Sequence, residues 1–128
     1  MTTRIQDIPG SHRLAATLPA FTAASDDGLR QPIAKVPFGA KVNTIEVYFQ
    51  GTASVTLSGS DTAKLIAYAG TVPIGTAQIG TVTMGNALTV FSGTRSVDAD
   101  TLLWIQYGTV GSGINLPESL AVVTLKAA

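Results

Sequence analysis

The 128-residue chain carries eight basic and eight acidic side chains, and 45% of its residues are hydrophobic while only 12% are charged. A chain of this length suits one globular domain, because it can bury roughly two-thirds of the surface that it exposes when unfolded. The balanced charge argues against nucleic-acid binding, no apolar run reaches the roughly 18 residues of a membrane span, and the lack of Cys excludes disulfides, thiolate catalysis and sulfur-ligated zinc.

The first 32 residues differ in pattern from the rest of the chain. They contain three prolines and an Asp26-Asp27-Gly28 turn signal, and they show no sustained period of 2 or 3.6 residues. We therefore predict an extended N-terminal arm over residues 1–32, followed by a β-sandwich domain over residues 33–128. A short helix over His12–Leu18, ended by Pro19, is the alternative for part of the arm.

Such an arm would have no hydrophobic core of its own, and terminal segments of this kind become ordered when they lie against another molecule. We therefore predict that the apolar residues of the arm contact a neighbouring subunit. These candidate interface residues are Ile5, Ile8, Leu14, Leu18 and Phe21.

From Ile33 onward the chain consists of short strand-like runs separated by Gly, Pro, Ser and Asp. In residues 41–50, for example, Ile45, Val47 and Phe49 alternate with polar neighbours, which is the period of a β-strand. The sequence predicts an all-β fold, a two-sheet antiparallel β-sandwich of about eight strands and jelly-roll type. The expected strands are residues 33–36, 41–50, 53–57, 64–69, 76–84, 87–91, 101–109 and 120–125.

Two of these runs carry additional expectations. The run over residues 101–109 is apolar on both of its faces, so it should lie centrally in a sheet and be covered on each side. Residues 71–85 contain three five-residue units that each end in Gly. Because five is odd, these units require a bend or bulge, and Pro73 favours an edge or loop position. The segment is either a Thr-rich edge that makes contacts or a kinked strand without a partner.

The chain offers little for catalysis. His12 is the only histidine, and no serine nucleophile motif accompanies it. Asp98 and Asp100 stand where a turn precedes a strand, so backbone hydrogen bonding explains them, with calcium ligation and paired-carboxylate catalysis as alternatives. We expect no enzymatic activity, no cofactor, no metal and no small-molecule substrate.

Four aromatic residues could form a sugar-stacking platform: Trp104, Tyr107, Tyr48 and Tyr68. Trp104 stands between Leu103 and Ile105, which favours packing in the core or between subunits. Tyr48 and Tyr68 are out of phase with the apolar residues of their strands, so we predict that both face outward and serve as interface residues.

Three segments together resemble the jelly-roll virion proteins of tailed bacteriophages, which include capsid decoration (cement) proteins. The segments are residues 36–49 (VPFGAKVNTIEVYF), 63–70 (AKLIAYAG) and 96–107 (SVDADTLLWIQY). The resemblance implies a symmetric homo-oligomer, with a trimer favoured, on the capsid exterior, bound to the lattice of the major capsid protein. It transfers no catalytic residues. A carbohydrate- or receptor-binding β-sandwich module is the alternative function.

Overall fold

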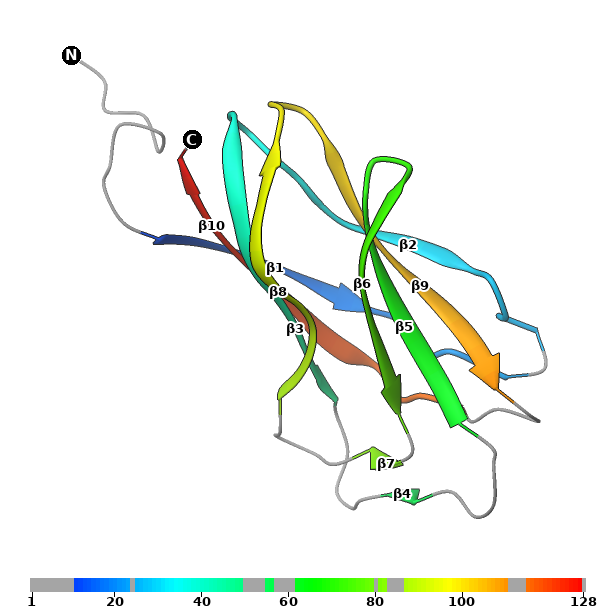
Figure 1. Cartoon of the computed structure of the whole chain (residues 1–128). Helices are drawn as coiled ribbons and strands as arrows, with labels where there is room; N and C mark the ends of the chain where they lie inside the picture. Colours follow the sequence, from blue (N-terminus) through cyan, green and yellow to red (C-terminus); the bar gives the residue numbers. More distant parts are fainter. Residues whose placement is uncertain are drawn as a thin grey trace.

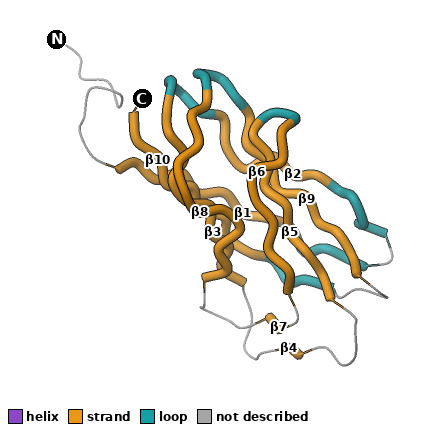
Figure 2. Tube along the Cα trace, viewed as in Figure 1, coloured by secondary structure: helices purple, strands orange, loops and turns teal. Residues whose placement is uncertain are grey.

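The computed structural model describes residues 11–23, 25–49, 55–56, 62–79, 81–82, 87–110 and 115–127, which contain strands and loops but no helix (Figure 2). A short pair, β4 (Val55–Thr56) and β7 (Thr81–Val82), accompanies eight longer strands. The longer strands are β1 (Ser11–Leu18), β2 (Arg30–Lys35), β3 (Ala40–Phe49), β5 (Thr62–Ala69), β6 (Val72–Ile79), β8 (Ala87–Val97), β9 (Leu102–Val110) and β10 (Ser119–Ala127).

The longer strands form two four-stranded antiparallel sheets, in the orders β1-β10-β3-β8 and β2-β9-β5-β6 (Figure 1). If these eight strands are counted in chain order, the sheets read 1-8-3-6 and 2-7-4-5. Every successive pair of these strands is divided between the two sheets except β5 and β6, which are neighbours in one sheet, and this order is the double Greek key of a jelly roll. The predicted all-β, two-sheet sandwich is confirmed.

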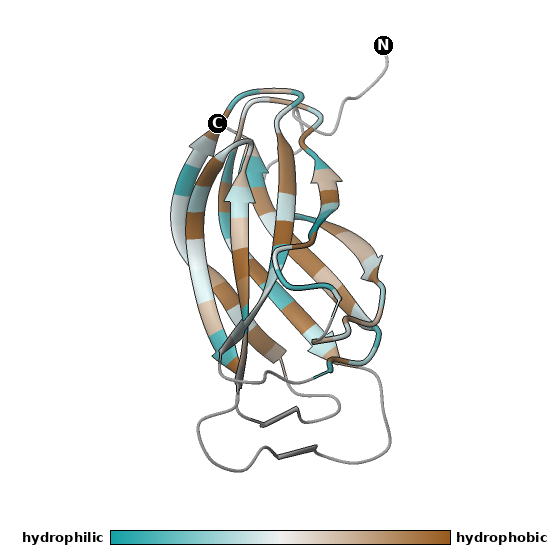
Figure 3. Ribbon diagram, turned by 90° about the vertical axis from the view of Figure 1, so that its right-hand side faces the viewer, coloured by the Kyte–Doolittle hydropathy of each residue, from teal (hydrophilic) through white to brown (hydrophobic). Residues whose placement is uncertain are grey.

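The core lies between the two sheets and is built by period-two alternation along the strands, visible as alternating brown and teal bands in Figure 3. In β3, Val42, Ile45 and Val47 are fully buried, and the residues between them are more exposed. β5 and β9 contribute Leu65, Leu103 and Ile105 from the opposite sheet. Burying one face of each sheet against the other is what holds the two layers together.

The sheets also meet along both of their sides, where β1 contacts β2 and β6 contacts β8. At Gly75 of β6 the approach is so close that a Cβ would collide with the Val90 carbonyl oxygen of β8. Glycine is therefore required here because of space, since only a residue without a side chain allows two backbones this near to each other.

The predicted boundary between an arm and a sandwich at residue 32 is wrong. β1 pairs with β10 along its whole length, and β2 pairs with β9, so residues 11–18 and 30–35 are strands of the sandwich. Leu18 and Phe21, which we expected to contact a neighbouring subunit, are 0% and 2% exposed in the chain's own core. The short helix proposed for His12–Leu18 is likewise wrong. Residues 1–10 lie outside the described residues, so an arm of that length stays a prediction.

The sequence pattern did not predict β1 as a strand because its period-two alternation is weak. His12, Leu14, Ala16 and Leu18 face the interior, and the residues that alternate with them are exposed. Alanine at positions 15 and 16 and histidine at the first inward position dilute the contrast between the two faces. The strand is stabilised by pairing with β10, whose residues are 101 to 115 positions away in sequence, so a local pattern cannot show this pairing.

The expected bulge and edge position within residues 71–85 are found, and the expected central, doubly covered strand over residues 101–109 is found in part. The register shifts between Ala67 and Tyr68 of β5, opposite Gly75 and Pro73, so β6 is bulged, and it is an edge strand. β9 lies centrally between β2 and β5, as expected. It is covered on one side only, however, because Leu102 remains 39% exposed on the outer side.

Candidate functional site

One residue from each strand of the sheet β2-β9-β5-β6 forms a row across its outer face. Trp104 of β9 stands opposite Tyr68 of β5 on one side and opposite Pro32 of β2 on the other, and Tyr68 stands opposite Pro73 of β6. We call Pro32, Trp104, Tyr68 and Pro73 the aromatic row. The row faces outward because its neighbours along the strands, such as Leu103 and Ile105, fill the core.

Arg30 lies on the same outer face and reaches the row. It stands opposite Gln106 of β9, and its guanidinium carbon lies 4.1 Å from the centroid of the Tyr68 ring, two strands away. At this distance the cation is attracted to the π-face of the ring. The exposed Arg30 side chain therefore extends across β9 and places a positive charge directly over the Tyr68 ring.

All charged side chains on the four strands of this sheet are basic. Arg30 and Lys35 lie on β2 and Lys64 lies on β5, and none of the four strands contains Asp or Glu. Lys35 pairs with the loop residue Asp100 at 3.8 Å, an exposed contact of small energetic value. Lys64 lies across Gly108, since a Cβ there would be 2.7 Å from Lys64 Cε.

The outer face of the opposite sheet, β1-β10-β3-β8, has a different chemistry. Its rows are Ser11–Lys126–Lys41–Ser96, Arg13–Thr124–Thr44–Ser92, Ala15–Val122–Glu46–Thr89 and Thr17–Leu120–Tyr48–Ala87. We call it the threonine face, because small and hydroxyl-bearing side chains dominate it. Leu120 is its most conspicuous apolar group, 42% exposed and directly opposite Tyr48.

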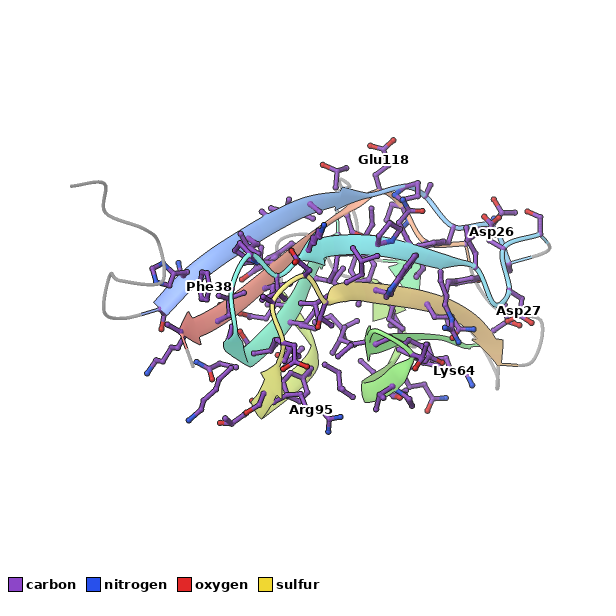
Figure 4. The ribbon with its side chains drawn as sticks, turned by 90° about the horizontal axis from the view of Figure 1, so that it is seen from above. Asp26, Asp27, Phe38, Lys64, Arg95 and Glu118 are labelled. Carbon is purple, nitrogen blue, oxygen red and sulfur yellow. The ribbon has the colours of Figure 1, made fainter. Side chains whose placement is uncertain are left out.

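The loop between β1 and β2 gathers carboxylates at one end of the sandwich, far from Phe38 at the other end (Figure 4). Asp26 accepts a hydrogen bond from the Thr22 N–H at 2.7 Å, and Asp27 accepts one from the Thr109 N–H at 3.0 Å. Each carboxylate thus satisfies a backbone donor and fastens the loop, one to itself and one to β9.

Tyr107 of β9 lies beneath this loop. Its ring is fully buried and stacks on Phe21, with 5.1 Å between centroids and 1° between planes. Burial raises the pKa of the Tyr107 phenol, and the negative charges of Asp27 and Asp26 raise it further. Tyr107 is therefore a core residue and not part of an exposed aromatic platform.

The predicted interface residues do not come together in one place. Leu18 and Phe21 are in the core, and Leu14 is partly buried and packs against it. Tyr48 and Tyr68 both face outward as predicted, but on opposite sheets, and both are partly exposed. Ile5 and Ile8 lie outside the described residues.

Sequence patterns did not single out Arg30 or Leu120. Trp104, expected to pack in the core or between subunits, lies on the outer face of its sheet and is not a core residue, and its packing between subunits stays a prediction. For Trp104 the available signal was its alternation with Leu103 and Ile105, which assigns it to the face opposite the core. The position of Arg30 over Tyr68 left no comparable trace in the sequence, because the two residues are 38 positions apart.

The groups considered for catalysis and metal binding stand apart from one another. His12 packs edge-on against Phe38, with 5.8 Å between ring centroids. Asp100 adopts a positive φ of 69° in the turn before β9, and its N–H donates to the Val36 carbonyl, which supports the turn interpretation of this segment. In the described part of the chain no three His, Cys, Asp or Glu side chains are grouped so that they could hold a metal ion, and no helix could span a membrane.

No protein-family model and no curated protein sequence matches the chain. Among solved structures, a chain of the T13 IBDV viral particle is 12% identical with a TM-score of 0.44, over 92% of this chain and 31% of that one. A chain of the infectious bursal disease virus Gt strain is 12% identical with a TM-score of 0.29, over 94% of this chain and 37% of that one. This chain spans about a third of the length of those viral proteins, and the likeness concerns the fold alone.

Proposed function

We propose that this protein is a non-enzymatic structural virion protein of the capsid decoration (cement) type, located on the capsid exterior. The observation that carries the proposal is the eight-stranded jelly-roll connectivity, an architecture used by viral capsid domains. Because one architecture serves many functions, the choice of this function depends on which surface residues could attach the protein to a capsid.

The threonine face is the surface best suited to attachment. Its small side chains let another protein approach closely. The charged residues of its four strands, Arg13, Lys41, Glu46, Arg95 and Lys126, all lie outside the row Thr17–Leu120–Tyr48–Ala87, so a contact centred on that row would remove few charges from water. Leu120 and Tyr48 supply an apolar centre. Since residues 11–32 belong to the sandwich, any contact by an arm falls to residues 1–10, with Ile5 and Ile8.

In this proposal each copy contacts coat subunits and its own copies, with a trimer favoured. Each contact is weak, and a lattice that presents many equivalent sites makes the sum large. Nucleic acid and membrane are not partners.

The test is sedimentation of the purified chain with tailed-phage capsids assembled without it. We expect the chain to sediment with the capsids and the Leu120→Arg variant to bind at least about tenfold more weakly, the effect of about 1.4 kcal/mol. Leu29→Arg is the matched control, because Leu29 has the same exposure of 42% but lies in a loop away from the threonine face. Failure of the parent chain to bind, with monomers in light scattering, would contradict the proposal.

A carbohydrate- or receptor-binding module is the second candidate function. The observation that favours it is the outward position of Trp104 and Tyr68 side by side on a sheet face. Lectin domains use the jelly-roll architecture as well.

A further inference from the structure

We propose that the aromatic row, together with Arg30 and Lys64, is a binding platform for an acidic polysaccharide. This inference rests on the second candidate function and does not depend on attachment to a capsid. It follows from three features of the outer face of the sheet β2-β9-β5-β6: its paired rings, its charge and its shape.

The rings supply the stacking surface. Trp104 and Tyr68 are directly opposite on adjacent antiparallel strands, so their Cβ atoms are about 5 Å apart. Both side chains are partly buried, and each strand is hydrogen-bonded on both sides, which fixes the rings before a ligand arrives. Ordering the site therefore costs little when the apolar C–H face of a sugar ring packs on it.

The charge selects an acidic ligand. Arg30 stands over Tyr68 at 4.1 Å, Lys64 lies along the same face, and no carboxylate belongs to these four strands. The guanidinium keeps donors for a carboxylate while it covers one side of the Tyr68 ring. The same charges disfavour a symmetric pairing of this face with a second copy, because the two faces would carry charges of the same sign.

The shape favours a polymer over a small ligand. The row runs across all four strands of an open sheet face, so a chain of sugar residues can lie across the strands and contact several side chains in turn. A flat face gives weak binding to any one sugar unit, and the repeated units of a polymer compensate through avidity.

The experiment is affinity electrophoresis of the full chain through native gels that contain a polysaccharide. The acidic probes are polygalacturonate, alginate and polysialic acid, and the neutral probes are methyl-esterified polygalacturonate and dextran. We expect retention by acidic probes only, weakened by added salt because of charge screening. Trp104→Ala and Arg30→Gln should each weaken retention about tenfold or more. Trp104→Phe and Arg30→Lys, which keep a ring and a charge, should retain most of it.

The controls are Tyr48→Ala and Lys126→Gln, which remove a ring and a charge from the threonine face and should leave retention unchanged. Acid-dependent retention that survives Trp104→Ala and Arg30→Gln would overturn this site. Equal retention by neutral and acidic probes would overturn the acidic specificity and leave a carbohydrate-binding module. No retention by any probe would overturn both the inference and the second candidate function, and the capsid assay would still decide the first.

Discussion

Replacing Gly75 with Ala should destabilise the sandwich at the side where its two sheets meet. The added Cβ would collide with the Val90 carbonyl oxygen and lie 3.2 Å from both Cα and Cβ of Phe91. These atoms cannot move aside alone, because β8 is hydrogen-bonded to β3. Overfilling a packed site typically costs 1–3 kcal/mol, and a collision with backbone belongs at the upper end, so we expect a loss of about 3 kcal/mol.

The assay is urea unfolding followed by circular dichroism. With an m-value of about 1.5 kcal/mol/M, a loss of about 3 kcal/mol lowers the midpoint by about 2 M at unchanged slope. Gly108→Ala is the matched control. Its Cβ would come within 2.7 Å of Lys64 Cε, but this is the far end of a flexible side chain, so we expect a change below about 1 kcal/mol. An unchanged midpoint for Gly75→Ala, or equal losses in the two variants, would refute the reasoning.

Three further predictions concern the core and its loops. Phe21→Ala should lower the free energy of unfolding by about 3–5 kcal/mol, because Phe21 is 2% exposed and stacks on Tyr107. A loss below about 1 kcal/mol in urea unfolding would show that Phe21 is not a core residue and would support the predicted arm instead. The pKa of Tyr107 is higher in the folded state than in the unfolded state, so the unfolded chain loses this proton first as the pH rises. The contribution of Tyr107 to the free energy of unfolding should therefore be complete below a pH of about 10 and decline at higher pH. Tyr107→Phe should flatten that alkaline decline in thermal melts, and an unchanged decline in this variant would contradict the prediction. Asp100→Val should cost about 1–2 kcal/mol by chemical unfolding, since a β-branched residue tolerates the φ of 69° poorly; Asp100→Gly, at the same position, should cost less.

Alternation of apolar and polar residues was sufficient to predict most of the fold. The run over residues 41–50 became β3, and the run over residues 101–109 became β9 at the centre of its sheet. The bulge in β6 also followed from local arithmetic, because an odd-numbered repeat cannot keep one face of a strand. These features depend on the backbone period alone, which each stretch of sequence carries within itself.

The role of the N-terminal segment could not be obtained in this way. Residues 11–18 have a diluted pattern, and they become a strand because β10 offers an unpaired edge and the core offers space for Leu18. The same holds for the candidate site, where Tyr48 and Tyr68 look alike in sequence but lie on opposite faces of the sandwich.

By itself the sequence determined an all-β sandwich, its central strand, its edge bulge and the scarcity of catalytic groups. Only the tertiary structure decided that Phe21 belongs to the core, that Trp104 and Tyr68 share one face, and that Arg30 lies 4.1 Å over the Tyr68 ring. The physical reason is that alternation fixes which side of its own strand a residue occupies, whereas strand order and register, set by contacts distant in sequence, fix which residues meet.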